Sequence, residues 1–71
     1  MFPNPVQGNT VFFSTDKQGT VQIYNILGKL IKTKTISIDN NKIDISSLSK
    51  GIYLVKINLE NQMITKKLVK H

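Results

Sequence analysis

Hydrophobic and polar residues alternate along most of this chain, and β-branched side chains fill many of the hydrophobic positions. Ile, Val and Thr recur from one end to the other, which is the composition that strands favour. No long segment repeats apolar residues at the three- and four-residue spacing of an amphipathic helix. The pattern therefore predicts an all-β chain.

Turn-forming residues divide the alternating segments from one another. Residues that favour turns are concentrated in three places, which are Gly8-Asn9, the segment 16–19 and Asp39-Asn40-Asn41. Short strands separated by such turns indicate a small antiparallel Ig-like β-sandwich. The strands are expected at residues 10–15, 20–25, 30–38, 42–46, 52–59 and 63–69.

The two-residue period also predicts which side chains form the core. Leu48 is expected to plug the crossover between the fourth and fifth strands, and the polar stretch 32–35 is expected at an edge or a bulge. Gly28 is expected to supply the left-handed residue of its turn, and Gly19 is able to take positive φ in the turn at 16–19. The predicted core residues are Val21, Ile23, Ile43, Ile45, Tyr53, Val55 and Ile57.

Composition narrows the possible chemistry. The chain of 71 residues is long enough for one small domain, and without cysteine it can form neither a disulfide nor a thiolate zinc site. All ten basic residues are Lys, and the net charge is +6. Lys attracts nucleic acid, anionic lipid head groups or acidic polysaccharide without defined geometry. Arg, in contrast, would form specific bidentate hydrogen bonds with guanine or phosphate. The alternative is that Lys keeps a small β-protein soluble and guards its edges.

Catalytic constellations are absent from the sequence. The sole histidine, His71, is terminal, and the four acids, Asp16, Asp39, Asp44 and Glu60, are too scattered for a paired carboxylate site. The glycines match no phosphate-binding loop. We therefore expect no enzyme activity, no cofactor and no bound metal. No apolar run is long enough for a membrane helix and no signal peptide is evident, so an export signal would lie on a longer parent chain.

Four segments together resemble a known family. They are FPNP at residues 2–5, VQIYNILGKLIK at 21–32, IDISSLSKGIYLVKI at 43–57 and TKKLVKH at 65–71. In order, spacing and placement they are similar to the type A C-terminal sorting domain of the type IX secretion system of Bacteroidota. The resemblance covers nearly the whole chain.

The resemblance implies a non-enzymatic secretion signal at the end of a larger cargo protein, here the single domain 1–71. The implied partners are the type IX outer-membrane translocon and a sortase-like surface peptidase, with anionic lipopolysaccharide as a group that can be joined to the cargo. The implied destination is the cell surface or the medium, after passage through the periplasm. The implied recognition residues are Pro3, Asn4 and Pro5 of the opening motif, Gly51, Tyr53, Val55 and Lys56 of the glycine-aromatic motif, and Lys66, Lys67, Leu68, Val69 and Lys70 of the basic terminal motif.

Two alternatives follow from the residues themselves. A small Ig-like adhesion or carbohydrate-binding module has the same fold, because fold alone does not decide function. A nucleic-acid-binding β-domain would use the net charge of +6. The lack of Arg and of clustered aromatic residues argues against specific nucleic-acid binding.

Overall fold

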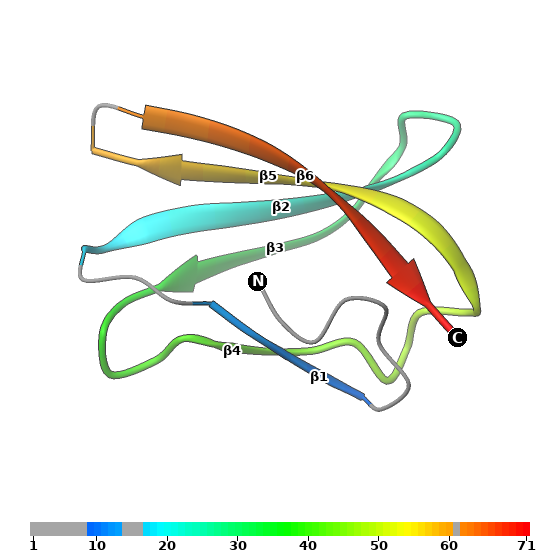
Figure 1. The fold of residues 1–71 in the computed structure, drawn as a ribbon, viewed down its shortest axis with the longest axis horizontal. Coiled ribbons are helices and arrows are strands. Elements are labelled where there is room, and N and C mark those ends of the chain that lie inside the picture. The colour runs from blue at the N-terminus through cyan, green and yellow to red at the C-terminus, as the bar shows by residue number, and fades with distance from the viewer. Residues whose placement is uncertain (1–8, 14–16, 61) are drawn as a thin grey trace.

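The computed structural model describes residues 9–13, 17–60 and 62–71, and every regular element in them is a β-strand (Figure 1). Within these ranges there is no helix with the length and apolar character needed to cross a bilayer. The strands are β1 (Thr10–Phe12), β2 (Gly19–Asn25), β3 (Leu30–Ile36), β4 (Lys42–Asp44), β5 (Gly51–Leu59) and β6 (Gln62–Lys70).

The strands form two layers. Four of them make an antiparallel sheet in the order β3-β2-β5-β6, and β1 pairs with β4 in a second, two-stranded antiparallel sheet. Figure 1 shows β1 and β4 lying beneath the larger sheet. This architecture confirms the predicted all-β fold and is consistent with a small Ig-like sandwich.

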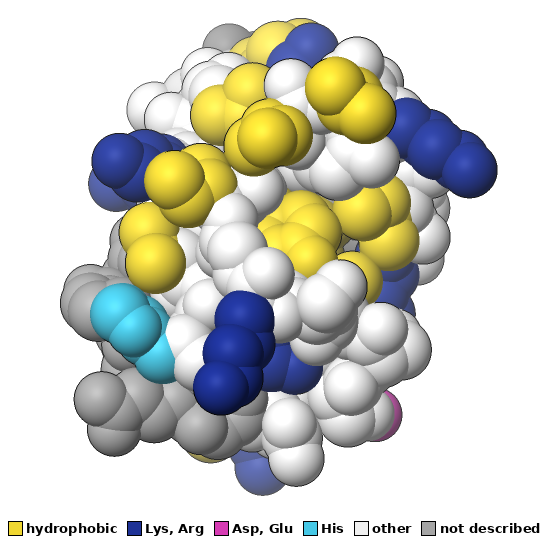
Figure 2. Space-filling model, turned by 90° about the vertical axis from the view of Figure 1, so that its right-hand side faces the viewer, with side chains coloured by type: hydrophobic (Ala, Val, Ile, Leu, Met, Phe, Trp, Pro, Cys, Tyr) yellow, Lys and Arg dark blue, Asp and Glu magenta, His cyan; other side chains and the backbone are white. Residues whose placement is uncertain are grey.

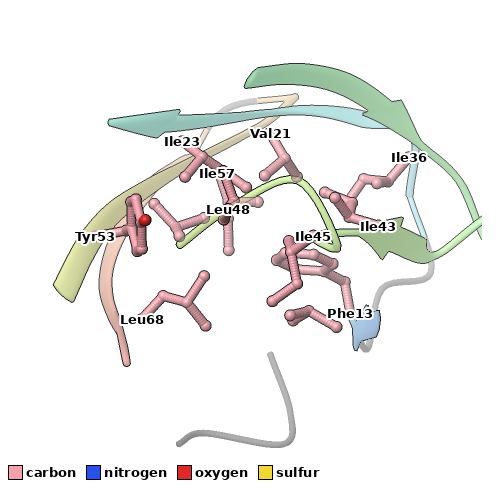
Figure 3. Packing of buried hydrophobic residues seen from close by; sticks show 12 residues of the cluster. Phe13, Val21, Ile23, Ile36, Ile43, Ile45, Leu48, Tyr53, Ile57 and Leu68 are labelled. Atoms are coloured by element: carbon pink, nitrogen blue, oxygen red, sulfur yellow. The ribbon is translucent and has the colours of Figure 1, made fainter. Parts of the chain in front are cut away.

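The core lies between the two sheets (Figure 3). All seven residues predicted from the two-residue period are buried there, and Leu48 fills the crossover as expected. The alternation works because successive side chains of a strand point to opposite faces. The residues that complete the core are Val11, Phe13, Ile36 and Leu68.

Some predicted strand boundaries were too generous. The third strand ends at Ile36, because Ser37 and Asn40 exchange two backbone hydrogen bonds of 3.0 and 3.1 Å and close a tight turn. The first strand ends at Phe12, although the N–H of Phe13 still donates to the carbonyl of Asn41 at 2.8 Å. The fourth strand ends at Asp44, whose carboxylate accepts a hydrogen bond from the N–H of Ser46.

Gly19 and Gly28 have different roles. Gly28 takes a φ of 87° in the β2–β3 turn, as predicted. Gly19 does not use its freedom to take positive φ. It begins β2, where a Cβ atom would lie only 2.5 Å from the backbone oxygen of Asn58. Glycine is needed at this position for close packing of two strands.

Candidate functional site

Two of the predicted motif segments are direct neighbours in the larger sheet. β5 carries the glycine-aromatic motif and β6 carries the basic terminal motif, and the two strands pair in antiparallel register along their whole length. Gly51 lies opposite Lys70, Tyr53 opposite Leu68, and Val55 opposite Lys66. Residues that are far apart in the sequence therefore share one β-ribbon, which forms one edge of the sheet.

The inward side chains of this ribbon hold the crossover loop between β4 and β5. The hydroxyl of Tyr53 donates to the carbonyl of Ser49 at 2.6 Å. Val55 and Leu68 are fully buried in the core beneath the ribbon. These three motif residues therefore build the fold, and a partner protein could not reach their side chains without unfolding the domain.

Lys70 differs from the other two lysines of the basic terminal motif because its side chain is buried. Its side chain is only 9% exposed. Its Nζ atom donates to the carbonyl oxygens of Ile45 and Leu48, both at 2.7 Å. A buried ammonium is costly unless it is hydrogen-bonded, and here two backbone acceptors satisfy it. Lys70 fastens the end of β6 to the crossover loop.

The remaining motif residues stay nearer the surface. Lys66 and Lys67 are exposed, and Val69 and Lys56 are half-buried. The Nζ atom of Lys56 lies 5.1 Å from the centre of the Tyr24 ring on the outer face of the sheet, a cation–π contact. Among the described motif residues, Lys66 and Lys67 are the side chains best placed to meet a partner.

Sequence reasoning missed a second set of structural lysines, on β3. Lys32 Nζ donates to the carbonyl of Asp44, and Lys34 Nζ donates to the carbonyl of Lys42 at 2.7 Å. The N–H of Ile45 donates to Asn9 on the β1 side, so the even-numbered residues of β4 turn their carbonyls the other way. Lys32 and Lys34 therefore bond to the carbonyls on the edge of β4 that faces away from β1. The sequence could have indicated this, because Lys32, Lys34 and buried Ile36 follow one another at two-residue intervals and so share one face of the strand.

The carboxylate of Asp44 is held by the residues that follow β4. The N–H of Ser46 donates to Asp44 Oδ1 at 2.9 Å. This backbone hydrogen bond, with a second from the Ser46 side chain and the nearby charges of Lys32 and Lys70, holds the pKa of Asp44 below its ordinary value. No group of three His, Cys, Asp or Glu side chains that could hold a metal ion occurs in residues 9–13, 17–60 and 62–71.

Pro3, Asn4 and Pro5 of the opening motif lie outside the described residues. A family model described as "Secretion system C-terminal sorting domain" matches residues 1–71. No curated protein and no solved structure matches the chain. A sorting domain marks a protein for export and acts as a signal rather than as an enzyme. With an all-β fold and a family match over its full length, this chain belongs to the family of secretion system C-terminal sorting domains.

Proposed function

We propose that this chain is a type A sorting signal that directs its parent cargo through the outer-membrane translocon of the type IX secretion system in a Bacteroidota host. The observation that carries the proposal is the family match over residues 1–71. It gives no support to the alternative of an adhesion or carbohydrate-binding module. The domain ends a larger secreted protein, and the cargo passes through the periplasm to the cell surface or medium.

The translocon recognises the β5–β6 ribbon in its folded form. Tyr53, Val55, Leu68 and Lys70 set the shape of this ribbon from inside. An edge strand offers its backbone groups for strand addition by another protein, and Lys66 lies exposed on that edge strand. The proposed recognition set also includes Gly51, Lys56, Lys67 and Val69, together with Pro3, Asn4 and Pro5.

The domain itself performs no chemistry in this proposal. A sortase-like surface peptidase removes it after export, and anionic lipopolysaccharide is joined to the cargo. Both steps act at the junction with the cargo. The sorting domain contributes the signal that brings the cargo to them.

The test is a secretion assay with a reporter. The domain is fused to the C-terminus of a reporter that carries a Sec signal, in a type IX-competent host, and reporter is measured in periplasm, cell surface and medium. We expect the wild-type fusion at the surface or in the medium. Deleting residues 66–71 should leave the reporter in the periplasm. That deletion also removes Leu68 and the contacts of Lys70, so it alters the fold as well as the signal.

A milder variant separates recognition from folding. Lys66→Ala with Lys67→Ala removes two exposed charges, and we expect it to fold normally and to secrete poorly. The matched control, Lys17→Ala with Lys42→Ala, removes two charges from exposed lysines elsewhere and should secrete normally. If the Lys66/Lys67 variant folds and secretes like wild type, the backbone of the ribbon, rather than these charges, carries the signal. If the wild-type fusion itself stays in the periplasm, the proposed function is wrong.

A further inference from the structure

One end of the molecule presents large hydrophobic side chains to solvent. The turn between β2 and β3 displays Ile26 and Leu27, which are 72% and 88% exposed. Figure 2 shows hydrophobic side chains gathered on this end, with Lys side chains around them. A gathered apolar patch on a small protein usually marks a contact surface, whereas scattered apolar residues do not.

Hydrogen bonds hold the backbone of this turn in a fixed conformation. Asn25 Oδ1 accepts hydrogen bonds from the N–H groups of Leu27 and Lys29, at 2.9 and 3.0 Å. The N–H of Gly28 donates to the carbonyl of Asn25 at 3.0 Å. Binding through a fixed turn orders little additional chain, which lowers the entropy cost of association.

The patch continues onto the outer face of the larger sheet. Tyr24 lies opposite Leu30 on one side and Leu54 on the other, so three strands contribute one apolar row. Ile52 precedes Leu54 by two residues and is exposed on the same face. We call this surface the apolar end; its residues are Tyr24, Ile26, Leu27, Leu30, Ile52 and Leu54.

Charge is distributed unevenly between the two ends of the sheet. Lys29 in the turn and Lys50 beside β5 are exposed near the apolar end, and Lys56 lies over the Tyr24 ring. Asp39 and Glu60 follow the final residues of β3 and β5, which lie at the opposite end. Among the described residues, Lys29, Lys50 and Lys56 surround the apolar end, whereas Asp44, which lies near Lys32 and Lys70, belongs to β4 in the second sheet.

We propose that the apolar end docks on a bilayer surface that carries anionic head groups. In this arrangement Ile26 and Leu27 enter the head-group region, and the rim lysines pair with lipid phosphates. A protein groove fits the observations less well, because Lys is depleted at protein interfaces and the turn projects outward. The inference stands on the surface alone and does not depend on the proposed function.

The first test is vesicle binding by the purified 71-residue chain. Co-sedimentation is measured with phosphatidylcholine vesicles and with vesicles in which a quarter of the lipid is phosphatidylglycerol. We expect stronger binding to the anionic vesicles, because each Lys near such a surface contributes about fivefold in affinity. Equal or undetectable binding to both would overturn the proposal.

Variants separate the apolar contact from simple charge attraction. Ile26→Ser with Leu27→Ser should lower the affinity for anionic vesicles at least about tenfold, because burial of each aliphatic side chain is worth that much or more. The matched control is Ile38→Ser with Met63→Ser, two exposed hydrophobic residues, 66% and 64% exposed, at the opposite end of the sheet. The control should bind like wild type, and both variants should keep the wild-type circular dichroism spectrum.

A fluorescent variant reports insertion directly. The chain contains no Trp, so Leu27→Trp introduces a single tryptophan into the turn, and it can be excited separately from the two tyrosines. We expect a blue shift of its emission with anionic vesicles and quenching by brominated lipid. Three outcomes would contradict the proposal: no shift, equal loss of binding in the control variant, or a concentration-dependent dimer that forms through Ile26 and Leu27 in place of vesicle binding.

Discussion

The two edge strands of the larger sheet, β3 with two lysines and β6 with three, place these side chains differently. On β3, Lys32 and Lys34 reach across to the carbonyls of β4 and join the two layers. On β6, Lys70 does the same for the crossover loop, whereas Lys66 remains exposed. The β3 edge places both of its lysines on backbone carbonyls of the other layer, while the β6 edge keeps part of its charge on the surface.

The difference shows that the number of lysines on a strand does not measure its available charge. An inward lysine next to free backbone carbonyls completes the hydrogen bonding of the opposite layer. A lysine beyond the reach of such carbonyls stays in water and can meet a partner. The basic terminal motif of this chain contains both kinds, so its residues must be tested singly.

The largest effect is expected when the β6 clamp is removed. Lys70→Met keeps the aliphatic stem but deletes the donor to the carbonyls of Ile45 and Leu48. We expect the free energy of unfolding to fall by about 1.5–3 kcal/mol, the range for hydrogen bonds to charged groups. Urea denaturation measures it. Lys66→Met is the matched control on the same face of β6. Equal stability of both variants would show that the Lys70 hydrogen bonds do not stabilise the fold.

A smaller effect is expected from the corresponding change on β3. Lys32→Met with Lys34→Met removes two donors that are only half-buried. We expect a loss of about 1 kcal/mol, since partly solvated hydrogen bonds contribute less than buried ones. Thermal unfolding followed by circular dichroism measures it. A loss as large as that of Lys70→Met would mean that the two edges do not differ in this respect.

The exposed lysines of β6 should matter least for stability. Lys66→Ala with Lys67→Ala should change the free energy of unfolding by no more than about 0.5 kcal/mol, as surface substitutions usually do. Chemical denaturation of the purified domain checks this. A larger loss would place these side chains among the structural lysines and would remove the basis for using the variant in the secretion assay.

Asp44 links the two edges electrostatically, because charges from both Lys32 and Lys70 act on it. Its pKa is lowered in the folded state, chiefly by the Ser46 backbone hydrogen bond. A lowered carboxyl pKa stabilises the fold above the unfolded pKa of about 3.9, and this contribution is lost as pH falls through the folded pKa. We expect a small loss of stability below about pH 4 that Asp44→Asn reduces. Identical pH dependence of the variant and wild type would contradict this assignment.

The core was predictable because its residues repeat with period two between turn residues. Val21, Ile23 and Ile57 follow that rule and are buried. Lys70 follows the same rule, two residues after Leu68. A lysine is nevertheless expected on the surface unless a buried carbonyl that can accept its hydrogen bond is known. Gly19 likewise reads as a turn glycine until the approach of Asn58 is seen. The two-residue period predicts which face of a strand a side chain lies on, whereas its contacts are known only from the packed structure.

The recognition residues were predictable only through the family resemblance. Spacing alone could not show that Gly51 lies opposite Lys70, because register between strands depends on the whole sheet. Nor could it divide the motif into buried residues such as Tyr53 and exposed residues such as Lys66. The family resemblance identifies the motif segments, whereas the sheet determines which of their side chains a partner can reach.

The Asn25 turn also bears on how the chain folds. Its hydrogen bonds close the β2–β3 hairpin between neighbouring residues, and such hairpins form in about 1–10 μs. β2 must then find β5, with Val21 opposite Ile57, and pairing between distant segments is the slow part of β-sheet folding. We expect the meeting of two local hairpins, β2–β3 and β5–β6, to limit the refolding rate. Changes in the Asn25 turn should then alter the unfolding rate less than changes between β2 and β5.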